Sequence, residues 1–203
     1  RRALPLIVTG LGRQHPVHRS TKPVIANIVL LGRHDAVTAV GGFVKQALID
    51  NEGLAPEVVR VIYNGIEPSE PLDSSTGTAA RSGARAALGI APDTPVVMQV
   101  ARFHPVKDHA TAIDAFAKVN EQWPGAVLVL IGDGPGRAGA EQQARRLGIA
   151  DRVMFTGVRG DVRDLLPGAD VFLLSSLSEG ISVTLLEAMD ARLPIVATEV
   201  GGN

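Results

Sequence analysis

The chain has 203 residues, 45% of them hydrophobic, which suits one large globular domain, or one domain and part of another, and excludes a disordered chain. It contains no cysteine, which excludes disulfides, thiolate zinc sites and a cysteine nucleophile. Lys and Arg (20) balance Asp and Glu (21) to a formal net charge of -1, which argues against a nucleic-acid binder. No apolar run approaches the roughly 18 residues of a membrane span.

Short apolar runs alternate with segments of helical spacing along most of the chain. Most runs are continuously apolar, which is typical of strands buried on both faces of a parallel sheet. The predicted strands are Leu4–Thr9, Ala36–Val40, Val58–Ile62, Pro95–Ala101, Ala126–Ile131, Arg152–Phe155, Val171–Leu174 and Pro194–Thr198. The predicted helices are Lys107–Gln122 with Asp108 as its N-cap, Pro135–Leu147, Val162–Leu166 and Val183–Ala191. This alternation predicts an α/β fold with a doubly wound parallel sheet.

One stretch, Glu67–Asp93, breaks the alternation. It is rich in Pro, Ser and Gly, and only a single weak helix is predicted, near Ala79–Leu88. Such an interruption between two strand–helix series is typical of a linker between domains. A long surface loop inside one domain is the alternative.

Several common motifs are absent. The sequence has no G-x-x-x-x-G-K-[ST], which excludes a P-loop nucleotidase, and no G-x-S-x-G nucleophile elbow. Its five histidines show no metal-ligand spacing, so we expect no metal site. The glycine-rich Gly132–Gly136 follows a predicted strand but lacks dinucleotide-binding spacing. It is either a turn near a ligand or only a tight strand-to-helix connection.

The segment from Ser178 to Met189 carries more information. It follows a predicted strand, Gly180 permits an unusual backbone turn, and a helix is predicted to begin near Val183. The first amides of such a helix are unpaired and carry the positive end of the helix dipole, so they form an anion site. Glu179 and Glu187 lie on either side of it, and both can accept hydrogen bonds from sugar hydroxyls. Two glutamates at this spacing are more often ordinary surface residues, and the residues alone leave both readings open.

The same segment resembles the E-x7-E signature of the family-four retaining glycosyltransferases, which have the two-domain GT-B fold of Rossmann-like domains. Four further stretches fall in the order of that family's motifs, and the resemblance covers the chain from about Ala36 to Asn203. They are Val61–Ile66 at the family's hinge, Val100–Asp108 at its Arg- and Lys-bearing loop, Ile131–Pro135, and Phe155–Gly157.

The resemblance implies a site for a nucleotide-diphosphate sugar between the two domains, with no metal or other cofactor. Arg102 and Lys107 would stabilise the diphosphate as leaving group, which is electrostatic catalysis. Glu179, the third catalytic residue, would contact the transferred sugar, and Glu187 the ribose. The other implied donor-binding residues are Val158 and Arg159 near the base, and Gly180, Ile181, Ser182, Val183 and Thr184 near the phosphates. A solvated loop residue is an equally good reading of Arg159.

The sequence departs from the family pattern in three places. Arg192 stands where many members have glycine, at a helix end that favours a left-handed residue. A non-glycine residue in that conformation costs about 1 kcal/mol, so the turn is either reshaped or mildly strained. Asp190 is also unusual. The histidine that many relatives carry soon after an acceptor-domain strand is not evident after Thr9, and His15 is only an unsupported substitute.

These observations predict three regions in part of a longer protein. Residues 1–65 would be the C-terminal part of an acceptor-side domain, residues 66–94 an interdomain linker, and residues 95–203 a truncated donor-binding domain. We expect the full protein to transfer a sugar, with retention, to a glycan or lipid-linked acceptor. It would have no nucleic-acid partner and would be cytoplasmic, with any peripheral contact to the inner face of the membrane made through the missing part. We expect the 203 residues alone to bind donor weakly and turn over poorly.

Two alternatives remain at this stage. A nucleotide-sugar 2-epimerase of the GT-B fold would share the nucleotide site but perform different chemistry. The Arg102 and Lys107 loop and the glutamate pair match the transferases better. A non-catalytic nucleotide-sugar-binding module is the second alternative, motivated by Arg192 and by the missing histidine.

Overall fold

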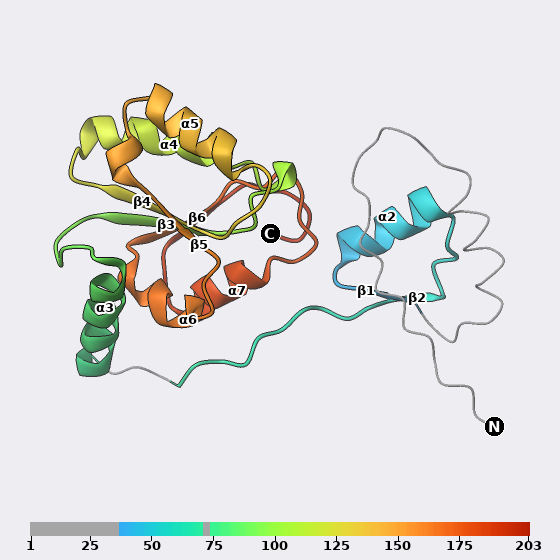
Figure 1. The fold of residues 1–203 in the computed structure, drawn as a ribbon. Coiled ribbons are helices and arrows are strands. Elements are labelled where there is room, and N and C mark those ends of the chain that lie inside the picture. The colour runs from blue at the N-terminus through green and yellow to red at the C-terminus, as the bar shows by residue number, and fades with distance from the viewer. Residues whose placement is uncertain (1–36, 71–73) are drawn as a thin grey trace. The chain divides into compact units, whose positions relative to one another are not determined.

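The structure is a computed structural model that describes residues 37–70 and 74–203. These residues form two compact units, both drawn in Figure 1. The smaller unit contains residues 37–65 together with 178–182 and 201–203. The larger contains the described residues of 66–177 and 183–200. The predicted strand Leu4–Thr9 and the residue His15 lie outside the described residues.

The larger unit is built on a parallel sheet of five strands in the order β5-β4-β3-β6-β7 (Figure 1). The central strands β3 and β6 are neighbours although β4 and β5 lie between them in sequence, so the strand order reverses beside β3. A crevice at the carboxyl ends of the strands is expected at such a switch point. The strands are β3 (Val96–Val100), β4 (Val127–Ile131), β5 (Val153–Gly157), β6 (Val171–Leu174) and β7 (Ile195–Ala197).

Helices cover both faces of this sheet. Figure 1 shows α4 and α5 on one face and α3, α6 and α7 on the other, which confirms the predicted doubly wound α/β fold. The helices are α3 (Ser74–Leu88), α4 (His109–Gln122), α5 (Arg137–Arg146), α6 (Val162–Leu165) and α7 (Val183–Asp190). Short 3-10 helices are η1 (Pro105–Lys107), η2 (Ala150–Arg152) and η3 (Leu166–Gly168). No helix in the described part of the chain is both long and apolar enough to cross a membrane.

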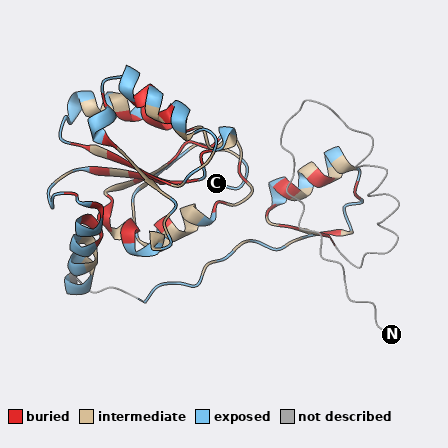
Figure 2. Cartoon of the chain, in the orientation of Figure 1, coloured by how far each residue is buried: buried red, intermediate tan, exposed pale blue. Residues whose placement is uncertain are grey.

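The core of the larger unit lies in two layers, one on each face of the sheet. Phe103, Phe116 and Leu128 belong to the layer under α4 and α5, whereas Met98 and Phe172 belong to the layer under α6 and α7. Figure 2 shows the buried stretches concentrated along the sheet and on the helix faces that meet it. Because the central strands are buried on both faces, their sequences are continuously apolar, and this is why the strands were predictable.

Helix α3 is longer than the sequence predicts and packs against the rest of the larger unit. Its Arg85 is only 2% exposed and donates to the carbonyl oxygens of Pro92 at 2.5 Å and Thr94 at 2.7 Å. Arg85 also pairs at 2.9 Å with Asp170, which accepts a hydrogen bond from the Val96 amide at 2.7 Å. The Pro- and Ser-rich stretch therefore packs, from residue 74 onward, against the start of β3 and the turn before β6.

The smaller unit contains a strand–helix–strand motif formed by β1 (Val37–Ala39), α2 (Gly42–Glu52) and β2 (Val59–Val61). The two strands are parallel, and α2 covers them through Val44 and Leu48. The sequence did not predict α2. It begins directly after Gly41, ends at Gly53 in the left-handed conformation (φ 67°), and buries only these two residues.

Close backbone packing holds the returning segments 178–182 and 201–203 in the smaller unit. Gly201 has φ 59°, and a Cβ atom there would lie 1.8 Å from the carbonyl oxygen of Glu179. A Cβ atom on Gly202 would lie 2.0 Å from the carbonyl oxygen of Gly180. Any side chain at either position would therefore separate the two segments.

Candidate functional site

A pocket of about 350 Å³ lies at the carboxyl ends of three strands of the larger unit. Val100 to Arg102 line it at the end of β3, Ile131 to Asp133 at the end of β4, and Val158 and Arg159 just after β5. Thr184, at the start of α7, also lines it. The pocket thus brings together four of the residues that the sequence singled out, namely Arg102, Val158, Arg159 and Thr184.

The glycine turn after β4 (Gly132–Gly136) packs against the backbone of residues 101–103, called here the Arg102 segment. Gly132 has φ 140°, and a Cβ atom there would lie only 2.1 Å from the carbonyl oxygen of Ala101. The Phe103 amide donates to the Asp133 carbonyl at 2.9 Å, and the Gly136 amide donates to the Phe103 carbonyl at 2.9 Å. The turn is a tight strand-to-helix connection, as one of the two readings expected, and Gly132 and Asp133 also line the pocket.

Lys107 ends the 3-10 helix η1, five residues after Arg102, and is half-buried. It is not among the residues that line the small pocket. Asp108 follows in the left-handed conformation (φ 44°) and accepts a hydrogen bond from the Thr111 amide at 3.2 Å. This confirms Asp108 as the N-cap of α4. A short polar side chain that bonds locally is one of the few that tolerate this conformation.

His109 is a buried residue that packs against Phe103, next to Arg102, and the sequence patterns predict no role for it. Its ring stacks on that of Phe103 at a centroid distance of 3.9 Å. Burial lowers the pKa of His109 to about 4, although a hydrogen bond with the backbone of Ala101 acts in the opposite direction. The imidazole is therefore neutral at pH 7. The signal that could have revealed it is its spacing from Ala112, Ile113 and Phe116 on the apolar face of α4.

Arg159 lines the pocket but is engaged with a neighbouring carboxylate. Its Nε donates to Asp161 at 2.8 Å and its Nη2 at 2.5 Å, so the pair is bidentate. The hydrogen bond from Arg159 lowers the pKa of Asp161, and the same contact raises the pKa of the guanidinium. This pair, which the sequence does not predict, fixes the direction of the Arg159 side chain.

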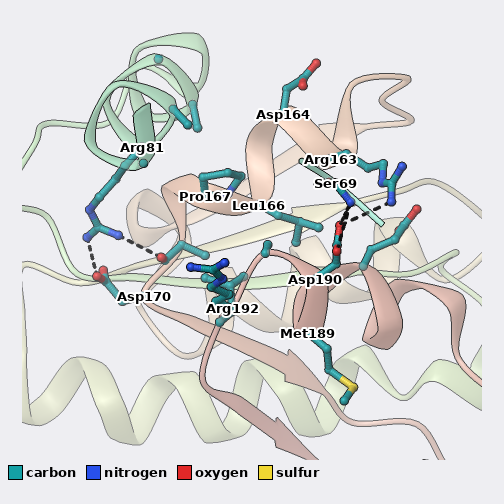
Figure 3. A pocket seen from close by; sticks show the side chains of 18 of the residues that line it. Ser69, Arg81, Arg163, Asp164, Leu166, Pro167, Asp170, Met189, Asp190 and Arg192 are labelled. Carbon is teal, nitrogen blue, oxygen red and sulfur yellow. Dashed lines mark hydrogen bonds and ion pairs between the residues drawn. The ribbon is translucent and has the colours of Figure 1, made fainter. Parts of the chain in front are cut away.

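Val183 is the first residue of α7, and Thr184 and Glu187 lie three positions apart on that helix. Residues at this spacing are neighbours on one helix face. Glu187 lines a second, larger groove of about 1060 Å³, which α3, α6, η3 and the C-terminal end of α7 enclose (Figure 3). The two pockets therefore meet α7 one turn apart.

The larger groove explains why Asp190 is present. Figure 3 shows its carboxylate between Ser69 and Arg163. It accepts the Ser69 amide at 3.0 and 3.2 Å, and Arg163 lies 3.5 Å away. The hydrogen bond from Ser69 lowers the pKa of Asp190. Arg163 also donates to the carbonyl oxygen of Glu67, so this cluster attaches residues 67–69 to α6 and α7.

Arg192 occupies the left-handed position after α7, with φ 58°. The Leu193 amide donates to the Ala188 carbonyl at 3.0 Å, and the Arg192 amide donates to the Met189 carbonyl at 2.9 Å. These two bonds form a Schellman helix end, which normally has glycine at this position. The turn keeps its ordinary shape, so arginine bears the mild strain that was one of the two expected outcomes.

Residues Glu179 to Ser182 belong to the smaller unit, whereas Val183 to Glu187 belong to the larger one. Glu179 and Ser182 are buried. A Cβ atom on Gly180 would lie 3.0 Å from a methyl carbon of Val40, and Asn64 Nδ2 donates to the Ile181 carbonyl at 3.4 Å. The structure thus divides the E-x7-E segment, with its first glutamate in one unit and its second in the other.

Within residues 37–70 and 74–203, no group of three or more His, Asp or Glu side chains is arranged to hold a metal ion.

Comparison with known proteins places this architecture among relatives of known class. N-acetyl-alpha-D-glucosaminyl L-malate synthase of Bacillus anthracis is 30% identical over 201 residues, which are 97% of this chain and 50% of that protein. The putative glycosyltransferase EpsF of Bacillus subtilis is 34% identical over 84% of this chain and 44% of its own length. The chain therefore spans about half the length of the curated relatives it matches.

Solved structures and a family model agree with these relatives. The crystal structure of Anabaena HepE in complex with UDP and glucose superimposes with a TM-score of 0.82 at 28% identity, covering 98% of this chain and 54% of that one. The structure of WaaG, a glycosyltransferase involved in lipopolysaccharide biosynthesis, gives a TM-score of 0.71 at 27% identity, covering 82% of this chain and 45% of that one. Residues 81–203 match the family model described as glycosyl transferases group 1. The chain is part of a GT-B protein and belongs to this glycosyltransferase family.

Proposed function

We propose that the protein containing this chain transfers a sugar from a nucleoside-diphosphate sugar to an acceptor, and that the larger unit binds the donor nucleotide. The observation that carries the proposal is the small pocket at the carboxyl ends of β3, β4 and β5, beside the switch point of the sheet, which both Arg102 and Thr184 in the first turn of α7 line. Parallel α/β sheets bind ligands at this position, and a helix N-terminus favours a phosphate.

Two cations near each other in the sequence suit a diphosphate: Arg102, which lines this pocket, and Lys107, which ends η1 outside the pocket lining. We assign Arg102 and Lys107 to the diphosphate, where they offset the negative charge that develops as the nucleotide leaves, and we propose no metal or other cofactor for this step. Arginine provides a planar fork of donors and lysine a point charge, so the two can contact different phosphate oxygens. The amides of Val183 and Thr184 would add hydrogen bonds to the same group.

Other residues are assigned to the ends of the donor. We assign Glu187 to the ribose hydroxyls, Val158 and Arg159 to the base, and Glu179, with Gly180, Ile181 and Ser182, to the sugar and phosphate end. The complexes of HepE with UDP and with UDP-glucose, both near 28% identity to this chain, favour a uridine nucleotide. The lipopolysaccharide core glycosyltransferase LpsE of Rhizobium meliloti, 38% identical over 58% of this chain, favours a glycan or lipid-linked acceptor.

In the proposed reaction an acceptor hydroxyl oxygen bonds to the anomeric carbon, and the bond from that carbon to the diphosphate oxygen breaks. The hydroxyl proton passes to the departing nucleoside diphosphate. We propose that the anomeric configuration is retained, as the E-x7-E resemblance implies. Within this scheme residues 1–65 belong to the acceptor-side domain, and residues 95–203 to the donor-binding domain.

Calorimetric titration of the full-length protein with UDP, GDP and ADP tests the donor site. We expect one nucleotide to bind. Arg102→Ala and Glu187→Ala should each lower the affinity for that nucleotide by about tenfold or more, because each removes a charged hydrogen bond. Arg146→Ala, which removes an exposed arginine from α5, is the matched control and should bind normally. Failure of all three nucleotides to bind, or normal binding by Arg102→Ala, would refute the assignment.

A further inference from the structure

We infer that two buried polar side chains, Gln99 and Ser175, position Lys107 for the donor diphosphate. The inference rests on the proposed function, because it concerns the same site. Gln99 lies in the central strand β3, and Ser175 follows the other central strand, β6. Both side chains are inside the protein, with exposed fractions of 0% and 3%, so neither is proposed to touch the nucleotide.

The two side chains form one network beneath the turn that ends η1. Ser175 Oγ lies 2.8 Å from the carbonyl oxygen of Asp108 and 3.1 Å from that of Lys107, and donates toward both. Gln99 Nε2 donates to the Lys107 carbonyl and to Ser175 Oγ, each at 3.4 Å. The Ser175 hydroxyl therefore accepts from one side chain while it donates to the backbone of the turn.

A backbone hydrogen bond extends this support by one residue. The Leu177 amide donates to the Val106 carbonyl at 2.8 Å. Three consecutive carbonyl groups, those of Val106, Lys107 and Asp108, are thus held by groups from the two central strands or from the chain that follows them. The turn includes Asp108 in its left-handed conformation, which persists only where surrounding contacts determine the backbone.

Burying the Gln99 side chain is energetically unfavourable, which argues that its hydrogen bonds serve the site. The Oε1 atom of Gln99 is buried, and no group among the described residues donates a hydrogen bond to it. An unpaired polar atom in the centre of a sheet is unfavourable, and an apolar side chain like those of Met98 and Val100 would avoid that cost. What glutamine supplies at this position is the Nε2 group, which points to the Lys107 carbonyl and to Ser175.

This arrangement fixes the starting point of a long side chain. Lysine has many rotamers, so the position of its ammonium depends on how firmly its own backbone is held. Because Gln99 and Ser175 hold the Lys107 carbonyl, the Lys107 side chain starts from a fixed Cα–Cβ direction. Loss of the network should therefore weaken the contact of Lys107 with the diphosphate and leave the contacts of other residues unchanged.

A double-mutant cycle in the full-length protein tests the inference. UDP, GDP and ADP are titrated into the wild type, and the nucleotide that binds is then titrated into Ser175→Ala, Gln99→Met, Lys107→Ala and Ser175→Ala/Lys107→Ala. We expect Ser175→Ala and Gln99→Met each to weaken binding by about three- to tenfold, and Lys107→Ala by at least as much. In the Lys107→Ala background, Ser175→Ala should produce no further loss.

Gln143→Met is the matched control. Gln143 is also buried, and its Nε2 donates to the Ala110 carbonyl at 3.0 Å and to Asp114 at 2.6 Å, which joins α5 to α4. This variant loses similar hydrogen bonds away from the Lys107 turn, so it should lower thermal stability without changing nucleotide affinity. Thermal unfolding of each variant shows whether it folds. If Ser175→Ala does not fold, Gln99→Met takes its place in the binding measurements.

The outcomes separate the two proposals. If Ser175→Ala and Gln99→Met bind as the wild type does, or if Ser175→Ala weakens binding equally with and without Lys107, the positioning role is wrong while the donor site stands. If Lys107→Ala binds as tightly as the wild type, the assignment of Lys107 to the diphosphate is wrong, and the positioning role with it. If no nucleotide binds the wild type, the proposed function itself is overturned.

Discussion

His109 is a titratable group inside the larger unit, and its burial makes stability depend on pH. The pKa of its imidazole is lowered by burial from 6.5 to about 4. Between these values the unfolded chain binds a proton that the folded chain excludes, so the free energy of unfolding falls as the pH falls. The full loss is about 3 kcal/mol and is complete near pH 4, and this contribution is constant above about pH 6.5.

Urea unfolding at pH 7 and at pH 5 measures this effect. The fluorescence of Trp123, the single tryptophan of the chain and the residue that ends α4, reports on the larger unit. We expect the wild type to lose stability between these pH values and His109→Gln to lose much less, because glutamine does not titrate. His104→Gln, which changes an exposed histidine, should behave as the wild type does. An equal loss in His109→Gln would show that other groups cause the dependence.

At the scale of elements, the turn after β4 determines whether the Arg102 segment can be held in place. Gly132→Ala would put a methyl group 2.1 Å from the Ala101 carbonyl oxygen, at a backbone φ of 140°. We expect this variant to lose several kcal/mol of stability, because the backbone atoms in contact cannot move apart without strain. It should also bind nucleotide more weakly.

Gly139→Ala is the control for that substitution. Gly139 lies in α5, and a Cβ atom there would meet no atom within 4 Å. Alanine in a helix interior is favoured over glycine by about 0.5–1 kcal/mol. This variant should therefore unfold at a slightly higher urea concentration and bind nucleotide as the wild type does. A Gly132→Ala protein as stable as the wild type would contradict the close approach.

The elements that were predictable from the sequence are those whose pattern is local. All seven predicted strands within the described residues are present, because each is a continuous apolar run between turns. Helix α2 was not predicted, because it buries only Val44 and Leu48 and offers a weak apolar stripe. The full length of α3 was also missed. Its attachment depends on the buried Arg85, and a charged residue in a Pro- and Ser-rich stretch normally indicates exposure.

The candidate site shows the same division. Arg102, Val158, Arg159 and Thr184 were named from the resemblance to the family's motifs, and the structure shows that they line one pocket. The partners of these residues were not predictable. Gln99 and Ser175 act through contacts between segments far apart in the sequence, and no local pattern distinguishes them from ordinary core or surface residues. Only the spacing of His109 on the apolar face of α4 was a local signal.

At the scale of the whole molecule, the chain passes from one unit to the other several times. It leaves the larger unit after Leu177, returns to it at Val183 and leaves it again after Val200. The two glutamates of the E-x7-E segment consequently lie in different units, although only eight positions separate them.

This division leads to a prediction about the 203-residue chain and the full-length protein. The chain contains the small pocket but spans only about half of its curated relatives. We therefore expect it to bind the nucleotide more weakly than the full-length protein and to turn over poorly, because binding energy from distant parts of donor and acceptor is needed to orient the reacting groups. Calorimetry with the free nucleotide and a transfer assay with its sugar donor compare the two proteins. Transfer by the 203 residues at the rate of the full-length protein would mean that these residues already contain a complete active site.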